Sequence, residues 1–505
     1  MPITDSLRTA WRAFRRPGRL FTLAAAVLVV LAYGLLFAFG NHQSCAGPCQ
    51  PLPQSADGAP VNDQFWFLHR DLGRDGEITA RLTAMTGTIT YPPPNHDQIV
   101  PGLVPWAKAG LIVKDGVRPG SQYAALMRTG SHGVHFQSGY TNDVAAAGTG
   151  PWLRLTRAGN TITGAESADG QRWTPVATVV LDGLPDTVQV GLFATSPGDL
   201  SLRETGLGGA TEQVRFTQAA GTFDTVTVRG GAAGLWRSEP VGEMNQTDWE
   251  KYHQPSGAVE RAGVVTVSGT GDIGPRTAGP DSPQKALPGL TIAVLLVLVA
   301  AARFGARSER PELAARGTVV AAAGFGTGLL SVGILLPISR AILRGNGIPV
   351  APIPLWTMTG LVAGIAAALA LCAVFAFGLG AWLRRGWLAS AVATLLVAVP
   401  YVVTTFPLLP DPIADWLLRL TPAAGFSAAQ TAVEYPQVTA HYAASAGYFP
   451  LPGWAGLLVL GGFAALASVA AASRRNGSRS ASPTPPAAAV PAESSAPPPP
   501  PAVPR

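Results

Sequence analysis

Six long apolar segments constrain this chain more than any other feature of its sequence. Each approaches the roughly 20 uncharged residues that a helix needs to cross a bilayer. They are Leu20–Gly40, Leu287–Ala302 with an extension to 304, Thr318–Ile338, Leu355–Trp382, Trp387–Phe406 and Trp454–Ala472. Such segments predict a six-helix transmembrane α bundle. Only 13% of all residues are charged, which argues against a single soluble enzyme domain.

Arginines around these segments predict how the bundle is oriented. They are frequent in residues 1–19, in the loop 305–317 and at the start of 473–505. Because basic residues are retained on the cytoplasmic side, both termini of this multi-pass plasma-membrane protein are expected in the cytoplasm. Arg340 and Arg344 would then lie outside the cytoplasm, but these two arginines do not outweigh the larger number on the cytoplasmic side. The stretch 473–505 is rich in Ser, Pro and Ala, so it is predicted to be a disordered cytoplasmic tail.

The start of the chain combines an amphipathic helix with the first apolar segment. Leu7, Trp11 and Phe14 share one face of a helix within 1–19, and arginines line the other side. This pattern is typical of a helix that lies in the cytoplasmic interface of the lipid bilayer. The alternative is that the arginines only fix the topology, and the two interpretations are compatible. The segment 20–40 is roughly twice as long as the apolar core of a signal peptide, so a retained anchor is expected.

The region 41–286 holds nearly all the acidic residues and has the pattern of an extracytoplasmic β-sandwich inserted between the first two spans. Short segments of alternating polarity are separated by turn residues. The expected strands are 64–69, 77–86, 107–114, 123–129, 134–138, 152–157, 161–166, 174–181 and 187–194, with closing strands within 212–275. A turn at Arg74-Asp75-Gly76 is expected to separate the first two.

No residue pattern in this domain indicates catalysis, a cofactor or a metal ion. The carboxylates stand mostly at turn positions and form no local glycosidase pair. His132 and His135 are two residues apart, but a metal site needs a third ligand, so paired surface histidines are the preferred interpretation. Trp66, Tyr140 and Trp236 are candidates for stacking on a sugar ligand, but packing in the core is the preferred interpretation.

Two of the three cysteines stand just after the first apolar segment. Cys45 and Cys49 are expected to form a disulfide, because the compartment outside the cytoplasm is oxidising. A redox-active pair is the alternative, but no thioredoxin-like sequence surrounds them. Cys372 lies within an apolar segment and is predicted to be a packing residue.

The strand sequences of the β domain resemble a known family. The resemblance rests, in order, on Trp106–Leu111, Tyr123–Leu126, Trp152–Leu155, Ser167–Gly170 and Val190–Phe193. These stretches resemble the concanavalin A-like jelly roll that is appended to bacterial surface proteins and glycosidases. The resemblance covers about residues 60–200 and implies a jelly-roll sandwich. Some members of this class bind carbohydrate, but the fold alone does not fix the ligand.

The last third of the chain resembles a second family. The resemblance rests on Gly378–Arg385, Val399–Tyr401, Phe406–Pro410, Trp416–Phe426, Tyr435–Val438, Gly447–Leu451 and Trp454–Leu457. This succession is similar to the permease subunits of type-2 ABC transporters, an exporter group with six spans per subunit. It implies that the chain forms half of a translocation pathway. A second permease subunit, in a homo- or heterodimer, and a separate ATPase subunit are the implied partners.

Two segments have specific roles in such permeases. The stretch 407–453 is expected to form re-entrant or interfacial helices outside the cytoplasm, with ordinary surface helices as the alternative. The loop 305–317 stands where the family docks into its ATPase, although it is shorter here. Its coupling candidates are Arg307, Glu309, Arg310 and Glu312. A solvated charged loop is the alternative for this segment.

The sequence as a whole predicts the permease subunit of an ABC exporter and no enzymatic activity of its own. Uncharged spans argue against an ion-coupled carrier, and the chain has no P-loop motif. Its 36 basic and 30 acidic residues form no basic patch interleaved with aromatics, so no nucleic-acid partner is expected. The alternative is a non-transporting, membrane-anchored binding protein whose helices are a degenerate permease bundle.

Overall fold

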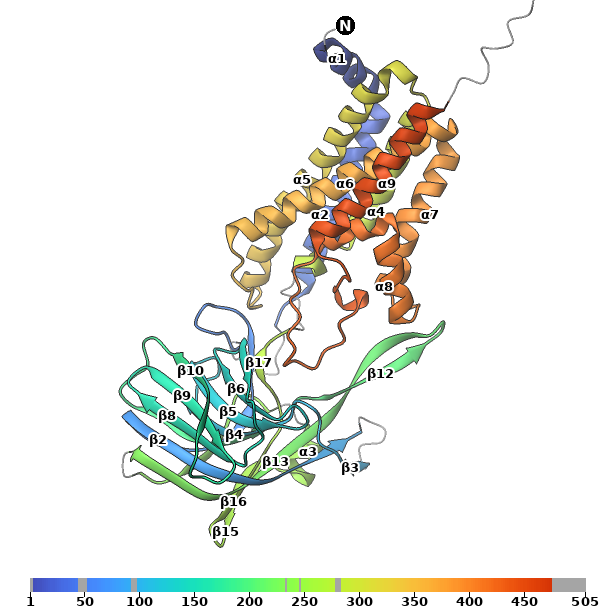
Figure 1. Ribbon diagram of the computed structural model, residues 1–505. Coiled ribbons are helices and arrows are strands. Elements are labelled where there is room, and N and C mark those ends of the chain that lie inside the picture. The colour runs from blue at the N-terminus through green and yellow to red at the C-terminus, as the bar shows by residue number, and fades with distance from the viewer. Residues whose placement is uncertain are drawn as a thin grey trace, which may run out of the picture.

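The apolar segments form one helical bundle, and the strands form a β domain beyond one end of that bundle (Figure 1). The computed structural model describes residues 3–43, 52–91, 98–231, 234–244, 247–277 and 283–474. The N-terminal helix and the end of the last helix lie at the end of the bundle away from the β domain (Figure 1). Cys45, Cys49 and the tail from residue 475 lie outside the described residues, so what the sequence predicts for them stays a prediction.

Five helices are long and apolar enough to cross a membrane. They are α2 (Pro17–Gly40), α5 (Leu313–Gly345), α6 (Leu355–Leu383), α7 (Gly386–Thr405) and α9 (Gly453–Ser473). The expected second span, 287–304, forms α4 (Gly289–Gly305), which is apolar but has only 17 residues. A helix of that length rises about 26 Å, less than the roughly 30 Å of bilayer hydrocarbon. The five long helices indicate a multi-pass membrane protein.

α4 and α6 are the inner helices of the bundle. α6 packs against α4, α5, α7 and α9, and α4 packs against α2, α6 and α7. The two inner helices approach closely because each presents a glycine to the other's backbone. A Cβ on Gly380 would lie 2.1 Å from the carbonyl oxygen of Ala302, and one on Gly305 would lie 2.1 Å from that of Phe377. Small residues at such crossings permit the close packing that holds helices together in lipid.

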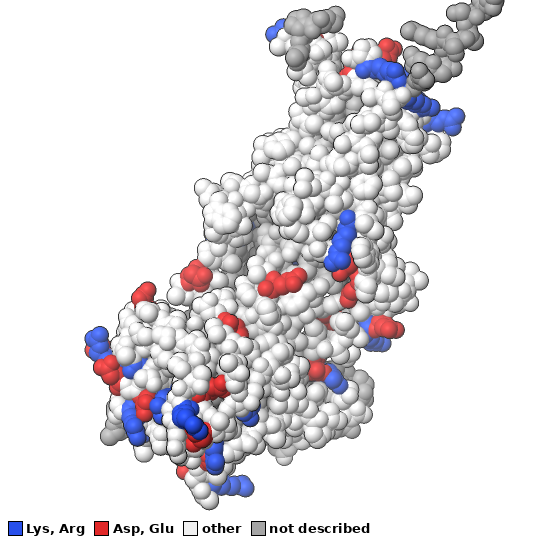
Figure 2. All heavy atoms as spheres, viewed as in Figure 1, with Lys and Arg blue, Asp and Glu red and all other residues white. Residues whose placement is uncertain are grey.

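The surface between the two ends of the molecule carries few charges. In the view of Figure 2, charged side chains gather on the β domain and at the far end of the bundle, and most of the bundle between them has none. Large apolar side chains are exposed along the helices, including Phe21 at 76% and Leu36 at 71%. An uncharged surface with many exposed apolar side chains is stable against lipid and unstable against water.

The β domain lies between α2 and α4 in the chain and forms a sandwich-like sheet. The strands are β1 (Val61–Asp63), β2 (Phe65–Thr90), β3 (Ile99–Pro101), β4 (Lys108–Lys114), β5 (Tyr123–Thr129), β6 (Val134–Ser138), β7 (Asn142–Ala145), β8 (Trp152–Ala158), β9 (Thr161–Ser167), β10 (Thr174–Val180), β11 (Val188–Thr195), β12 (Asp199–Thr205), β13 (Gly209–Gly231), β14 (Arg237–Val241), β15 (Gly257–Arg261), β16 (Val264–Gly269) and β17 (Ile273–Pro275), with one short helix, α3 (Asp248–His253). The main strand order is β10-β9-β8-β2-β11-β4-β5-β6-β7. The expected strands 123–129 and 134–138 coincide with β5 and β6, so these predictions are confirmed.

The longest strand corrects one prediction. The turn expected at Arg74-Asp75-Gly76 does not form, and β2 runs through it as a single strand of 26 residues. β2 is paired on both sides here, with Gly76 opposite Arg157 of β8 and β13 on the other side. A Cβ at Gly76 would lie 2.5 Å from the carbonyl oxygen of Arg229, so only glycine fits between the two neighbours. Pairing with two strands therefore overrides the local turn preference.

The first and last strands of the β domain pair with each other. β1 and β17 are antiparallel, with Asp63 opposite Ile273. Two ion pairs anchor this closure to β4: the Nζ of Lys114 lies 2.6 Å from Oδ2 of Asp63, and the Nζ of Lys108 lies 2.6 Å from Oδ1 of Asp272. The segments that come from α2 and lead to α4 are thereby fixed to the same strand.

Candidate functional site at the two ends of the helix bundle

The bundle has two chemically different ends. The end away from the β domain is formed by α1 (Ile3–Phe14), the α4–α5 turn, the α6–α7 turn at Arg384-Arg385, and Arg474. We name it the arginine end because of these side chains. The opposite end contacts the β domain (Figure 1), and we name it the domain end.

At the arginine end, α1 packs its apolar face against the bundle. Phe14 is 2% exposed and meets Phe304 of α4 edge to face, with ring centroids 5.3 Å apart. Leu7, which the sequence places on the same face, is half-buried. Trp11 is 47% exposed and stacks on the side of Phe14 at a centroid distance of 6.2 Å. The C-terminal end of α1 is therefore fixed to the bundle, whereas the side of α1 that carries Trp11 is partly exposed.

The expected coupling loop 305–317 is mostly helical. α4 continues to Gly305, a 3-10 turn η2 covers Arg310–Glu312, and α5 begins at Leu313. Pro311 is the second residue of this helical stretch; its fixed φ suits a first turn, where its missing N–H costs nothing. Only 306–309 remains without helix, so the connection is a tight turn.

The coupling candidates lie together on this turn, with different surroundings. The exposed side chains are those of Arg307, Glu309 and Arg310. Glu312 pairs with Arg316 one helical turn later, at 2.5 Å. Arg384 donates a hydrogen bond to the carbonyl oxygen of Ser308, which ties the turn to the end of α6. The turn therefore presents a small, fixed, charged surface and no protruding helix.

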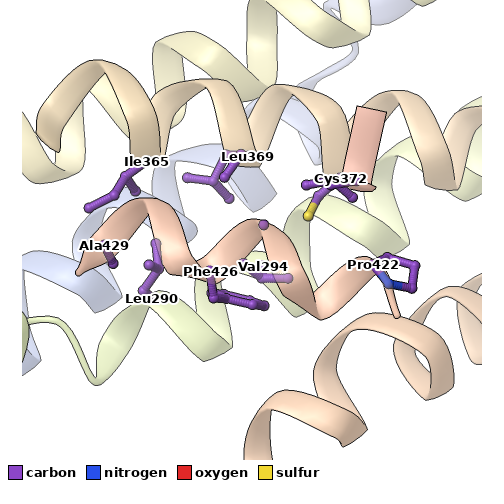
Figure 3. Close-up of a pocket in the computed structure, with 11 residues that line it drawn as sticks. Leu290, Val294, Ile365, Leu369, Cys372, Pro422, Phe426 and Ala429 are labelled. Carbon is purple, nitrogen blue, oxygen red and sulfur yellow. The ribbon is translucent and has the colours of Figure 1, made fainter. Parts of the chain in front are cut away.

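A small apolar cavity lies in the centre of the bundle. It has a volume of only about 10 Å³ and lies between α4, α6, α9 and the 3-10 helix η3 (Pro422–Ala429), as Figure 3 shows. Its walls are apolar, and Cys372 on its lining is 3% exposed, as expected of a packing residue. A cavity of that volume holds at most about one water molecule. This cavity therefore provides no room for a solute.

A helical hairpin of α8 (Asp411–Leu420) and η3 fills the domain end of the bundle. α8 leads into it, and Thr421-Pro422 reverses the chain into η3. η3 is buried from Pro422 to Ser427 and runs alongside α6 from Cys372 to Ile365 (Figure 3). Cys372 is close to the middle of α6, so the hairpin turn reaches deep between the helices. The re-entrant form predicted for 407–453 stays a prediction.

The other arm of the hairpin has an exposed apolar stripe. Ile413, Trp416 and Leu420 of α8 are 51%, 57% and 66% exposed, at spacings that place them on one face. The buried face carries Ala414 and Leu418. α8 is therefore amphipathic, and the interfacial form predicted for 407–453 stays a prediction.

The β domain contacts the base of this hairpin. The Oγ1 of Thr205, at the tip of the β12–β13 hairpin, donates to the carbonyl oxygen of Pro407 at 2.8 Å. The Nε2 of His441 lies 2.7 Å from Oδ2 of Asp411, and its Nδ1 lies 3.9 Å from Oε1 of Glu212 on β13. The sequence holds no local signal for these contacts, because Thr205 and Pro407 are 202 positions apart. They place the β domain directly on the base of the α8–η3 hairpin.

The three aromatic candidates of the β domain do not share one environment. Tyr140 is 3% exposed, and its hydroxyl donates to Asp63 and to the carbonyl oxygen of Ser121, so it is a core residue. Of the two interpretations of Tyr140, its burial fits packing in the core, and Tyr140 is no candidate for contact with a ligand. Trp66 is half-buried and Trp236 is 38% exposed, and both lie where β14 meets β2. These two remain the candidates for an exposed aromatic contact.

The two histidines of the β domain differ in burial: His132 is exposed and His135 is buried, so the prediction of paired surface histidines is wrong for His135. His132 stacks on Trp106 with centroids 4.0 Å apart, and His135 lies 2.5 Å from Oδ1 of Asp143 through its Nδ1. Burial lowers the pKa of His135, but the hydrogen bond and charge of Asp143 outweigh it, so the net pKa is raised. In the described part of the chain, no group of three or more His, Cys, Asp or Glu side chains is placed to hold a metal ion.

Comparison with known proteins adds little. No protein-family model matches the chain, and no curated protein matches it. Among solved structures, a functionally unknown protein from Saccharomyces cerevisiae is similar at 16% identity and a TM-score of 0.19, over 34% of this chain and 75% of that one. A similarity at this TM-score bears on neither the fold nor the function.

Proposed function

We propose that this chain is the membrane-spanning permease subunit of an ABC exporter. The buried hairpin α8–η3 between the last two long apolar helices, which we interpret as re-entrant, is the observation that carries the proposal. α4 acts as a sixth crossing helix, extended at its start by the buried segment around Leu287. The arginine end, with both termini, lies in the cytoplasm, and the jelly-roll β domain lies outside.

The small volume of the central cavity supports a substrate pathway between two permease subunits. A cavity of about 10 Å³ admits no substrate, so a route for transport runs along the surface of the bundle and needs a second permease to enclose it. The second subunit is another copy of this chain or a related permease. The β domain, seated on the hairpin through Thr205 and His441, is placed to respond when the hairpin moves.

The energy for transport comes from a separate ATPase subunit. The sequence has no P-loop, so ATP is bound and hydrolysed elsewhere. The exposed side chains of the α4–α5 turn, Arg307, Glu309 and Arg310, form the docking surface. Because the turn is short, α1 beside it supplies the rest of the contact.

Co-purification tests this proposal. The tagged full chain is isolated from native membranes in mild detergent, and its partners are identified by mass spectrometry. A P-loop ATPase whose ATP turnover depends on the chain is expected. The double variant Glu309→Arg/Arg310→Glu reverses both charges and should lower the recovery of the ATPase by about tenfold, because loss of charge complementarity weakens the contact between the two subunits. Arg344→Glu, an exposed reversal near the domain end, is the matched control and should leave recovery unchanged.

The short α4–α5 turn favours one alternative, a non-transporting membrane-anchored binding protein. In that case, no ATPase is recovered, and the full chain captures an extracytoplasmic ligand such as a cell-wall glycan. Binding of purified cell-wall polysaccharide to the full chain in detergent, with Trp236→Ala as the variant, separates the two functions. If the Trp236→Ala variant loses polysaccharide binding and no ATPase is recovered with the chain, the exporter proposal is wrong and the binding protein takes its place.

A further inference from the structure

A groove of about 750 Å³ lies at the arginine end between α1, the first half of α2, and α5. Its walls include Trp11 of α1, Leu23 and Val27 of α2, and Gly326 and Leu330 of α5. It is open on its outer side, where Trp11 and Leu330 are 47% and 54% exposed. This groove is far larger than the central cavity and takes no part in the proposed transport function.

The groove suits an aliphatic occupant. Thr327 and Arg8 are its polar lining residues, and the Thr327 hydroxyl donates to the carbonyl oxygen of Ala323 at 2.8 Å within its own helix. Water or a polar ligand would therefore find few partners along the walls. The α5 wall runs from Val319 to Leu330, about 16 Å at 1.5 Å per residue. This is roughly half of the hydrocarbon thickness, which is the reach of one acyl chain in one leaflet.

The mouth of the groove carries positive charge. Arg8 lines it, and Arg12, Arg15 and Arg16 follow on the exposed side of the same segment. The acidic side chain nearest in the helix, Asp5, lies 3.9 Å from Arg8, with both groups exposed, so this contact neutralises little. A lipid that has an acyl chain in the groove places its headgroup at this level, where arginines attract anionic headgroups.

We propose that the groove binds one anionic phospholipid, with an acyl chain between α1, α2 and α5 and the phosphate at Arg8. A bilayer lipid reaches the groove laterally, because the open side faces the apolar belt of the bundle. α1, held to α4 through Phe14, closes the groove at the arginine end. Binding in this place links the position of α1 to the lipid composition of the membrane.

Native mass spectrometry of the full chain tests this proposal. The chain in mild detergent is mixed with phosphatidylglycerol or phosphatidylcholine, and the bound fraction of each is measured. The wild type is expected to retain one phosphatidylglycerol about tenfold more strongly than phosphatidylcholine. In Gly326→Leu, where a Cβ meets nothing within 4 Å, the new side chain fills the groove and should weaken binding of phosphatidylglycerol about tenfold.

Two further variants make the outcome decisive. Gly462→Leu on α9 is the matched control, because a Cβ there also meets nothing within 4 Å, and it should bind like the wild type. Arg8→Gln should lose the preference for phosphatidylglycerol while the chain stays folded. Equal binding of both lipids by the wild type, or unchanged binding by Gly326→Leu, overturns the proposal. A dimer that Gly326→Leu dissociates would instead identify the occupant as a second copy of the chain.

Discussion

Replacing Asp63 by alanine should be one of the costliest single changes in the β domain. The carboxylate is fully buried, and its Oδ2 accepts hydrogen bonds from the Nζ of Lys114 (2.6 Å), the backbone N–H of Gly120 (2.7 Å) and the hydroxyl of Tyr140 (2.8 Å). Lys114 is also fully buried, and this burial lowers its pKa. Removing the carboxylate leaves the ammonium group without its counter-charge, which costs about 3–5 kcal/mol.

The expected loss can be followed by thermal melting of the full chain in detergent. For a domain of this size, 1 kcal/mol shifts Tm by about 2–4 °C, so Asp63→Ala should lower the Tm of the β domain by about 6–20 °C. The double variant Asp63→Asn/Lys114→Met should recover at least half of this loss, because it leaves no unpaired charge. Asp186→Ala is the control: Asp186 pairs with Arg74 at 3.2 Å on the surface, where an ion pair contributes at most about 1 kcal/mol.

Two results would refute the reasoning. If Asp63→Ala melts within about 3 °C of the wild type, the buried ammonium group is solvated after the substitution and the burial argument fails. If the double variant is no more stable than Asp63→Ala, the charges of Asp63 and Lys114 are not coupled. In that case the hydrogen bonds from Gly120 and Tyr140 would account for the loss.

Three other predictions concern separate parts of the chain. Burial lowers the pKa of His69, although the neighbouring Glu239 acts in the opposite direction. Neutral His69 therefore stabilises the fold above its unfolded pKa of about 6.5, and this stabilisation is lost as the pH falls. Between pH 7 and pH 5, the Tm of His69→Gln should decline less than the Tm of the wild type. Gly380→Leu forces α4 away from α6 and should abolish the monodisperse peak in size-exclusion chromatography, whereas Gly360→Leu, in open space, should retain it. His441→Ala removes the contact between α8 and β13, so trypsin should cleave after Arg203 faster than in the wild type.

Much of the fold could be predicted from the sequence because it depends on local patterns. An apolar run such as Leu355–Trp382 predicts a helix in lipid whatever its neighbours, and the helix α6 ends within one residue of it. β5 and β6 match their predicted bounds because glycines and other turn residues interrupt the strand pattern on either side. The amphipathic helix at 1–19 was also predictable, since its 3.6-residue period places Leu7, Trp11 and Phe14 on one face.

Other features were decided only by the tertiary structure. β2 continues through an expected turn because strands pair with it on both sides, and Tyr140 is buried because Asp63, 77 positions away, accepts its hydrogen bond. The depth of η3 depends on α6 and α9 leaving space between them, and the groove beside Gly326 exists only where α1 folds back towards α5. The sequence by itself determined which segments are helices or strands, because apolar length and periodicity are local. Contacts, burial depth and cavities required the tertiary structure, because each depends on residues that are distant in the chain.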